Sequence, residues 1–266
     1  MLTFPNAKIN LGLYITGKRT DGFHNLESIF YPVPFKDVLE IIPAPETRLH
    51  LSGIPVDAPS EKNLVWKAYE LLQQYCGGKL PRLDIFLHKA IPAGAGLGGG
   101  SADAAFMLRL LNDYAALGAT REELSALAAQ LGSDCPFFIY NQPMLGKGRG
   151  DLLTPVHLDL SGYSIQIVLP GIHISTAQAF SGIAPQPANI DWEQLCQTPV
   201  PDWKDVLRND FETTVFRQQP RLAHIKQQLY EGGAYYAAMS GTGSAVYGIF
   251  KKGEKAKLNL DYFYAA

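Results

Sequence analysis

The stretch PAGAGLGGGSADAA, Pro92–Ala105, has five glycines among its first nine residues and leads into a segment with the character of a helix. Glycine loses more backbone freedom on folding than any other residue, so a run this dense needs a reason. A helix N-terminus offers unpaired N–H groups and the positive end of the helix dipole, and glycines let an anion approach the backbone closely. The stretch therefore predicts a phosphate-binding loop in front of a helix.

The segments on either side of the loop support this interpretation. Residues 83–87 have the pattern of a strand that runs into the glycines, and we expect a helix from Ser101 to about Leu117, closed by Gly118. The alternative is a tight strand-to-helix turn without a ligand, but such turns seldom need more than one or two glycines. Ser101 can serve as the helix N-cap under either interpretation.

Three common kinds of phosphate loop do not fit the sequence. Gly94, Gly96 and Gly99 match the dinucleotide fingerprint, but the acidic strand end that it requires about twenty residues later falls on a helix start at 120–123. A Walker loop needs a lysine after the glycines, where this chain has Gly100-Ser101-Ala102. A protein-kinase loop needs H-R-D and D-F-G downstream, and neither tripeptide occurs in the sequence.

The composition limits the remaining classes. With 266 residues, 47% of them hydrophobic and 18% charged, the chain is globular and long enough for one large or two ordinary domains. A net charge of −2 gives no reason to expect a nucleic acid or a membrane as partner. Its three cysteines are far apart, and we identify no signal peptide or membrane span, so we expect a cytoplasmic protein.

Two further patterns concern the ends of the chain. Residues 7–16 alternate apolar and polar side chains, which predicts a strand with one buried face and with Lys8 and Asn10 together on the opposite face. Ser240–Ser244, the stretch SGTGS, lies between two strand-like runs and predicts a hairpin turn or a polar ligand wall. Glycines and prolines at 141–155 indicate a domain boundary, with one domain at 1–152 and the other at 153–266.

Five segments, in order along the chain, resemble motifs of the GHMP small-molecule kinases. The glycine loop is similar to the family's P-x-x-x-G-L-G/A-G-G-S-S/A-D/N-A-A element. The other four are NAKINLGLYITGKRTDGFHNLESIF (6–30), EKNLV (61–65), LGSDCPFF (131–138) and MSGTGSAVYGIF (239–250). The resemblance implies an α+β, two-domain GHMP kinase fold with the active-site cleft between the domains. It also implies ATP-dependent phosphorylation of a hydroxyl group on a small molecule.

The D-G-F-H block at 21–24 narrows the resemblance to one branch of this superfamily. In that branch the acceptor is the 2-hydroxyl of 4-diphosphocytidyl-2-C-methyl-D-erythritol, in the non-mevalonate isoprenoid pathway. Kinases of the homoserine or mevalonate type are one alternative, but they lack the block. A nucleotide-binding regulator that has lost turnover is a second, and the presence of Lys8 and Asp134 argues against it.

The resemblance assigns a catalytic pair. It implies that Asp134 is the general base for the acceptor hydroxyl and that Lys8 keeps Asp134 ionised and stabilises charge on the γ-phosphoryl group. Local sequence alone leaves Asp134 equally a turn or cap residue, and Lys8 an exposed strand lysine. Mg²⁺ is expected because phosphoryl transfer from ATP usually requires it, although no carboxylate cluster marks a metal cage.

The resemblance also assigns binding residues. The ATP side comprises the adenosine-side candidates and the loop, namely Asn63, Lys89, Pro92, Gly94, Gly96, Leu97, Gly98, Gly99, Gly100 and Ser101. On the acceptor side Phe23 and Phe180 sandwich the cytosine and His24 hydrogen-bonds its edge. Further acceptor candidates are Asn10, Thr176, Gly241 and Thr242. The expected partner is the small-molecule substrate, and the protein is expected to be a monomer or weak homodimer. The segment after Phe250 does not resemble the closing elements of the family.

Overall fold

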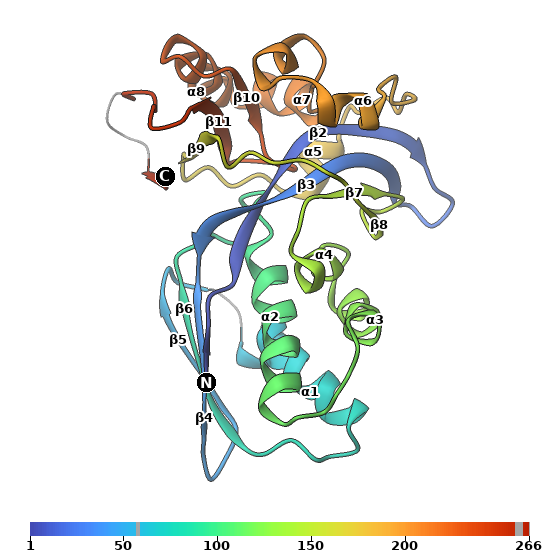
Figure 1. The fold of residues 1–266 in the computed structure, drawn as a ribbon, viewed down its shortest axis with the longest axis vertical. Helices are drawn as coiled ribbons and strands as arrows, with labels where there is room; N and C mark the ends of the chain where they lie inside the picture. Colours follow the sequence, from blue (N-terminus) through green and yellow to red (C-terminus); the bar gives the residue numbers. More distant parts are fainter. Residues whose placement is uncertain (57–58, 259–262, 266) are drawn as a thin grey trace. The chain divides into compact units, whose positions relative to one another are not determined.

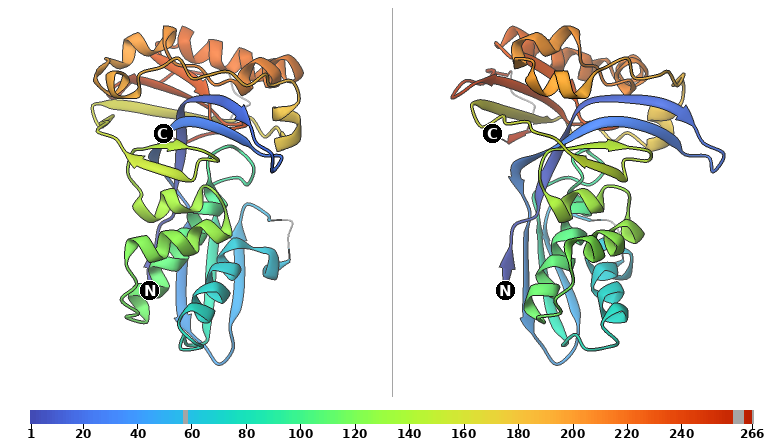
Figure 2. Two further views of the ribbon diagram at one scale, coloured as in Figure 1. Left: turned by 90° about the vertical axis from the view of Figure 1, so that its right-hand side faces the viewer. Right: turned by 45° about the vertical axis from the view of Figure 1, so that its right-hand side comes forward.

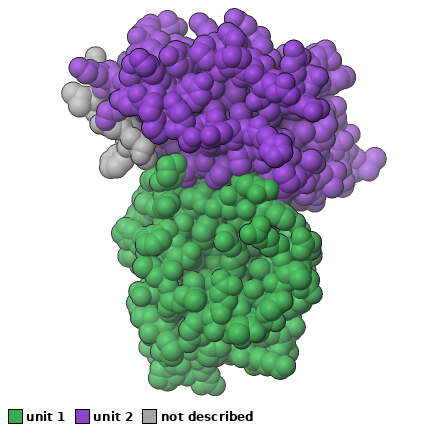
Figure 3. Space-filling view, in the orientation of Figure 1, with its two compact units in different colours: residues 1–7, 34–93, 98–142 green, residues 8–33, 94–97, 143–266 purple. Residues whose placement is uncertain are grey.

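The computed structural model describes residues 1–56, 59–258 and 263–265. The chain forms two compact units (Figure 3), of which unit 1 comprises Met1–Ala7, Pro34–Ala93 and Gly98–Gln142. Unit 2 comprises Lys8–Val33, Gly94–Leu97 and Pro143–Ala266. The chain therefore passes between the units several times. The domain limits expected at 1–152 and 153–266 stay a prediction.

Unit 1 is built on a four-stranded sheet in the order β1-β4-β6-β5. These strands are β1 (Leu2–Thr3), β4 (Val38–Pro43), β5 (Arg48–Gly53) and β6 (Leu83–Lys89). β6 is antiparallel to β4 and parallel to β5. Leu83, Ile85 and Leu87 are buried whereas Phe86 between them is exposed, so one face of β6 points into the core.

Four helices lie on one side of this sheet (Figure 1). They are α1 (Leu64–Tyr75), α2 (Gly99–Tyr114), α3 (Arg121–Leu131) and α4 (Cys135–Tyr140), with a short 3₁₀ helix, η1 (Ser60–Lys62), before α1. The predicted capping box of α3 is confirmed, because the Thr120 hydroxyl accepts from Glu123 N–H and the Glu123 carboxylate accepts from Thr120 N–H. No described helix combines the length and apolar character needed to cross a bilayer.

The predicted start of α2 was wrong by two residues. The helix begins at Gly99, and the N-cap is Gly98, with φ 72° and ψ 16°. It ends at Tyr114 rather than near Leu117. A serine such as Ser101 usually marks a cap because its hydroxyl can accept an N–H bond. Here the left-handed glycine starts the helix instead, and Ser101 lies inside the first turn.

Unit 2 contains two four-stranded sheets. One has the order β2-β3-β7-β8, from β2 (Asn6–Lys18), β3 (His24–Lys36), β7 (Met144–Lys147) and β8 (Leu152–Pro155). The other has the order β10-β11-β9-β12, from β9 (Tyr163–Leu169), β10 (Tyr236–Met239), β11 (Val246–Lys251) and β12 (Phe263–Ala265). β10 and β11 pair antiparallel around the stretch SGTGS, so the predicted hairpin is confirmed.

The helices of unit 2 are α5 (Thr176–Phe180), α6 (Trp192–Gln197), α7 (Phe211–Gln218) and α8 (Pro220–Glu231), with the 3₁₀ helix η2 (Val200–Asp205). α7 and α8 lie side by side over the second sheet (Figure 2). Val215 of α7 and Ile225 and Leu229 of α8 enter the same apolar core as Val246 and Phe250 of β11. This core supports the β10–β11 hairpin, and the hairpin tip carries candidate site residues.

β2 does not have the single buried face that its alternation predicts. Every residue from Asn6 to Leu13 is buried, including Lys8 and Asn10. The polar face of this strand is therefore covered by protein as well as the apolar face. Buried polar side chains need internal hydrogen-bond partners, so the contacts of Lys8 and Asn10 indicate how this face is used.

Candidate active site

The glycine loop joins β6 to α2 through a sequence of left-handed backbone turns. Gly94, Gly96 and Gly98 have φ values of 69°, 78° and 72°. Residues with a Cβ are strained in this region, whereas glycine is not. At Gly96 a Cβ would also lie 1.9 Å from the carbonyl oxygen of Ser240, a distance that no side chain can occupy. The left-handed backbone at Gly94, Gly96 and Gly98 therefore explains why the loop has glycine at alternate positions.

Backbone hydrogen bonds fix the middle of the loop within unit 2. The Ala95 carbonyl accepts from Ala245 N–H at 3.0 Å, and the Leu97 carbonyl accepts from Lys8 N–H at 2.9 Å. The Gly96 carbonyl accepts from the Ser240 hydroxyl at 2.8 Å. In a trans peptide the C=O and the next N–H point in opposite directions. The N–H group of each following residue therefore points away from these anchors and is oriented toward the other side of the loop.

The first turn of α2 continues this arrangement in unit 1. A glycine N-cap has no side-chain oxygen, so it cannot accept the first-turn N–H groups as a serine or aspartate would. Those groups and the helix dipole suit a phosphate. Gly99 fits here because a Cβ would lie 2.7 Å from Cγ2 of Ile91. The start of α2 thus presents N–H groups that no side-chain cap occupies.

Asp134 is the N-cap residue of α4 and is half-buried. The next residue, Cys135, is fully buried, and burial raises the pKa of its thiol to about 11. A hydrogen bond from the Ser101 hydroxyl to the same sulfur acts in the opposite direction, and the charge of Asp134 raises the thiol pKa further. Cys135 therefore stays a thiol at neutral pH and acts as a packing residue. Its contact with Ser101 joins the start of α4, where Asp134 is the N-cap, to the first turn of α2 within unit 1.

Lys8 belongs to a hydrogen-bonded row in unit 2. Its Nζ donates to Asn10 Oδ1 at 2.6 Å and lies 5.2 Å from the centre of the Phe30 ring. Asn10 Nδ2 donates to the Ser28 hydroxyl at 2.9 Å, and that hydroxyl donates to the Gly12 carbonyl at 2.6 Å. Lys8 is 4% exposed, so the alternative interpretation of Lys8 as an exposed strand lysine is wrong.

Ser28 and Phe30 were missed from the sequence. Their one signal is that they stand two residues apart in a strand after the D-G-F-H block, and therefore share a face. Lys8 is a residue of unit 2 and Asp134 a residue of unit 1. Their action as a pair stays a prediction.

The β10–β11 hairpin tip lies beside Asn10 and the loop within unit 2. A Cβ on Gly241 would come within 3.2 Å of Gly96 Cα and 3.4 Å of Asn10 Oδ1. The Gly241 carbonyl accepts from Asn209 Nδ2 at 2.8 Å, and the same amide reaches the Met239 carbonyl at 2.8 Å. Buried Asn209 was missed because nothing in its local sequence indicates a hairpin partner. Thr242 follows at the tip and is partly exposed.

The aromatic candidates take a different arrangement from a cytosine sandwich. The Phe23 ring is 52% exposed, and the Arg149 guanidinium lies 4.1 Å above its centre. His24 stacks on Phe180, with ring centres 4.6 Å apart and planes at 24°. One face of Phe180 is thus covered by His24 in this structure. The sandwich of a base between Phe23 and Phe180 stays a prediction.

The remaining candidates have structural partners. Asn63 is the N-cap of α1, where its Oδ1 accepts from Val65 N–H at 2.9 Å. Thr176 is the first residue of α5 and is exposed. Lys89 ends β6, and its ammonium group is enclosed by the carboxylates of Asp37 and Asp103. Because these carboxylates already occupy the ammonium group, a contact between ATP and Lys89 would have to use other atoms of the residue.

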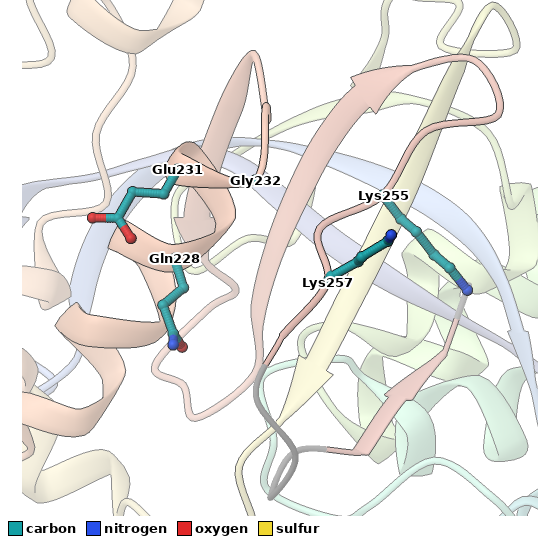
Figure 4. Close-up of a pocket in the computed structure, with 5 residues that line it drawn as sticks. All are labelled: Gln228, Glu231, Gly232, Lys255 and Lys257. Carbon is teal, nitrogen blue, oxygen red and sulfur yellow. The ribbon is translucent and has the colours of Figure 1, made fainter.

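A pocket of about 440 Å³ lies in unit 2 (Figure 4) and is lined by Gln228, Glu231, Gly232, Lys255 and Lys257. Figure 4 shows Gln228 and Glu231 on α8 and the two lysines on the segment after β11. None of the predicted site residues lines it. Within residues 1–56, 59–258 and 263–265 no group of three or more His, Cys, Asp or Glu side chains could hold a metal ion.

Two family models match the chain. One is described as the GHMP kinases N terminal domain and matches residues 63–142, and the other is described as GHMP kinases C terminal and matches residues 193–265. The 4-diphosphocytidyl-2-C-methyl-D-erythritol kinase of Parabacteroides distasonis is 51% identical over 252 residues, covering 95% of this chain and 92% of the relative. The same kinase of Bacteroides fragilis is 51% identical over 259 residues, covering 96% and 94%.

Solved structures agree with these relatives. A crystal structure of 4-(cytidine 5'-diphospho)-2C-methyl-D-erythritol kinase superposes with a TM-score of 0.81 at 30% identity, covering 94% of this chain and 90% of that one. Methanococcus jannaschii mevalonate kinase superposes with a TM-score of 0.70 at 13% identity, covering 96% and 92%. The second likeness shows a shared fold only.

Proposed function

Because the chain belongs to the GHMP kinases, and within them to the 4-diphosphocytidyl-2-C-methyl-D-erythritol kinases, we propose that Lys8 and Asp134 are its catalytic pair. The chain is an ATP-dependent small-molecule kinase. It phosphorylates the 2-hydroxyl of 4-diphosphocytidyl-2-C-methyl-D-erythritol in the non-mevalonate isoprenoid pathway. The homoserine and mevalonate alternatives are not favoured, and neither is a silent regulator.

One observation supports the assignment of the site: Ser101, in the first turn of α2, is hydrogen-bonded to Cys135, the neighbour of the half-buried Asp134, and that first turn has no side-chain cap. A phosphate at the helix start and a carboxylate next to it are the two groups that phosphoryl transfer to an alcohol needs. The residues proposed to bind ATP are those of the loop and its flanks, namely Asn63, Pro92, Gly94, Gly96, Leu97, Gly98, Gly99, Gly100 and Ser101. Lys89 is treated separately below.

In the proposed mechanism Asp134 accepts the proton of the acceptor hydroxyl as the new P–O bond forms. That hydroxyl is a tertiary alcohol and a weak nucleophile at neutral pH, so a base at this point contributes about 10²–10⁴ in rate. Lys8 supplies positive charge to the transferring phosphoryl group. Its bond to Asn10 at 2.6 Å fixes the direction of the ammonium, and the Asn10–Ser28 bond fixes Asn10 in turn. Fixed charge of this kind needs little rearrangement during the reaction.

Mg²⁺ is part of this proposal. The described residues offer no group of three or more His, Cys, Asp or Glu side chains that could hold a metal ion, which argues against a metal cage made by the protein alone. The residues present do fit an ion held mainly by nucleotide phosphates, since Mg²⁺ commonly takes only one or two protein oxygens. The hydroxyl of Ser101 would be such a ligand. Bound there, Mg²⁺ would neutralise charge on the phosphates.

Acceptor binding is proposed for Phe23, His24 and Phe180 around the cytosine. Asn10, Thr176, Gly241 and Thr242 are proposed contacts for the rest of the molecule. Since His24 already stacks on Phe180, a base that uses the same face must displace the His24 ring. Displacement would free the imidazole to hydrogen-bond the edge of the base, so one ring movement could serve both contacts.

Location and assembly are also proposals. The three cysteines are free thiols, which suits the reducing cytoplasm that we propose as the compartment. We propose a monomer or weak homodimer, and sedimentation across a range of protein concentrations tests this.

An assay of the purified protein tests the function. It contains ATP, Mg²⁺ and 4-diphosphocytidyl-2-C-methyl-D-erythritol, with homoserine and mevalonate as control acceptors. We expect ADP release that depends on the cytidyl acceptor and a product phosphorylated on the 2-hydroxyl. Turnover of either control at a similar rate, or ADP release without any acceptor, would contradict the assignment.

A further inference from the structure

Three buried charges meet in unit 1, next to the residues that lead into the glycine loop. Lys89, at the end of β6, donates from Nζ to Asp103 Oδ2 at 2.6 Å and also to Asp37 Oδ2. Asp37 lies between β3 and β4 and is fully buried, Asp103 belongs to the second turn of α2, and Lys89 is 5% exposed. We call Asp37, Lys89 and Asp103 the charge cluster. It joins three segments that are far apart in the sequence.

The charge cluster is bonded to both ends of the glycine loop. Asp37 Oδ1 accepts from the N–H groups of Ala90 and Ile91, at 2.6 and 2.8 Å, and these residues begin the loop. Asp103 is part of the helix into which the loop runs. Lys89 links the two carboxylates, so the entry and the exit of the loop are tied through one ammonium group.

Packing around the charge cluster leaves the helix start little freedom. A Cβ on Gly99, the first residue of α2, would lie 3.4 Å from Lys89 Nζ in addition to its clash with Ile91. On the other side, Ile54 N–H donates to the Lys89 carbonyl at 2.8 Å. A Cβ on Gly53 would lie 2.2 Å from that same carbonyl oxygen. The position of Lys89 is therefore fixed on both sides.

Stability alone is a weak reason for such a cluster. Burying charges costs solvation, and replacing a buried ion pair by apolar residues of similar volume is often neutral or stabilising. Here two carboxylates share one ammonium group, and Asp103 Oδ1 is buried without a hydrogen-bond partner among the described residues. The charge cluster is therefore better explained by a role in fixing the relative positions of these three segments than by a gain in folding stability.

We infer that Lys89 is a positioning residue: with Asp37 and Asp103 it holds both ends of the glycine loop so that the loop N–H groups stay arranged for the phosphates of ATP. This inference rests on the proposed nucleotide role of the loop. It replaces a direct contact between the Lys89 ammonium group and ATP. The two accounts differ most in what they expect of Asp37→Asn. If Lys89 contacts ATP directly, this change removes a negative charge near the phosphates and leaves ATP binding unchanged or tighter. If Asp37 helps to position the loop, the same change weakens ATP binding.

Calorimetric titration with a non-hydrolysable ATP analogue and Mg²⁺, without acceptor, separates these accounts. Lys89→Met and Asp37→Asn are each expected to weaken analogue binding at least tenfold, and Lys89→Arg to recover part of the loss. The control is Lys226→Met, which breaks the partly buried pair between Lys226 and Glu212 in unit 2, at 2.6 Å. It is expected to lower the melting temperature without changing analogue affinity.

The same variants are then assayed with acceptor. Positioning predicts a higher KM for ATP with the KM for acceptor unchanged and kcat reduced less than the ATP affinity. Unchanged or tighter analogue binding in folded Asp37→Asn would overturn the inference, as would an equal loss of affinity in the control. If Lys89→Met does not fold, Asp37→Asn alone decides. Analogue binding is measured without acceptor, so a failure of the proposed reaction would show separately as binding without turnover.

Discussion

The hydroxyl of Ser101, in the first turn of α2, is hydrogen-bonded to the thiol of Cys135, and Cys135 directly follows Asp134. This one contact connects the helix proposed to bind the phosphates to the residue proposed as base. Both residues belong to unit 1, so the relationship depends on the packing of α2 and α4 within that unit. The predictions that follow test the loop, the acceptor side, the charge cluster and the catalytic pair in turn.

Gly98→Val is expected to abolish ATP binding or raise the KM for ATP strongly while the fold is kept. Gly98 starts α2 in the left-handed region, and a β-branched residue there strains the backbone and moves the N–H groups. Gly118→Val is the matched control, because Gly118 also has a left-handed φ, of 71°, but open space around it. Titration with ATP and thermal unfolding of both variants are the measurements. Normal ATP affinity in folded Gly98→Val would remove the loop from the site.

Phe23→Ala is expected to weaken acceptor affinity about tenfold or more, since stacking on a base is worth roughly 1–3 kcal/mol. The KM for ATP should barely change. Phe86→Ala serves as control, because Phe86 is also an exposed ring but lies on the outer face of the unit 1 sheet. Steady-state kinetics with each substrate varied in turn give both KM values. Equal damage to both substrates would show that Phe23 matters for structure rather than for the base.

Asp103 is expected to make folding stability fall as pH rises through neutrality. Burial raises its pKa from 3.8 to about 7, and the charges that act on it are those of Lys89 and Asp37. A carboxyl with a raised pKa in the folded state binds its proton more tightly there than in the unfolded chain. Its contribution to the free energy of unfolding is therefore complete below the unfolded pKa and is lost as pH rises through about 7.

Urea unfolding of the wild type and Asp103→Asn between pH 4 and pH 8 measures this effect. The wild type should lose stability relative to Asp103→Asn across that range, because asparagine keeps the uncharged form at every pH. Parallel curves for the two proteins would show that Asp103 has an ordinary pKa.

The local features of the fold could be read from the sequence. The glycine loop stands between a strand and a helix as expected, and the capping box of α3 and the β10–β11 hairpin are confirmed. The start of α2 was misplaced because a left-handed glycine cap leaves no side-chain signal, whereas Ser101 gives one. Propensity rules therefore favour the serine.

Features that depend on contacts between distant segments could not be predicted from the sequence. The alternation in β2 predicts which residues share a face, and Lys8 and Asn10 do, but it does not show that their face is covered. The charge cluster joins Asp37 to residues more than fifty positions later, so no local pattern reveals it. Ser28 and Asn209 matter through single hydrogen bonds, and such partners depend on tertiary packing alone.

The joint action of Lys8 and Asp134 is the central claim. Its most direct test is a double-mutant cycle in kcat, with Asp134→Asn, Lys8→Ala and the double variant, and with circular dichroism to show that each folds. We expect each single variant to lose at least about a hundredfold in kcat with both KM values near wild type, and the double variant to lose little more, because residues that act as a unit are not additive. Near-normal kcat in Asp134→Asn, or losses that multiply in the double variant, would contradict the account.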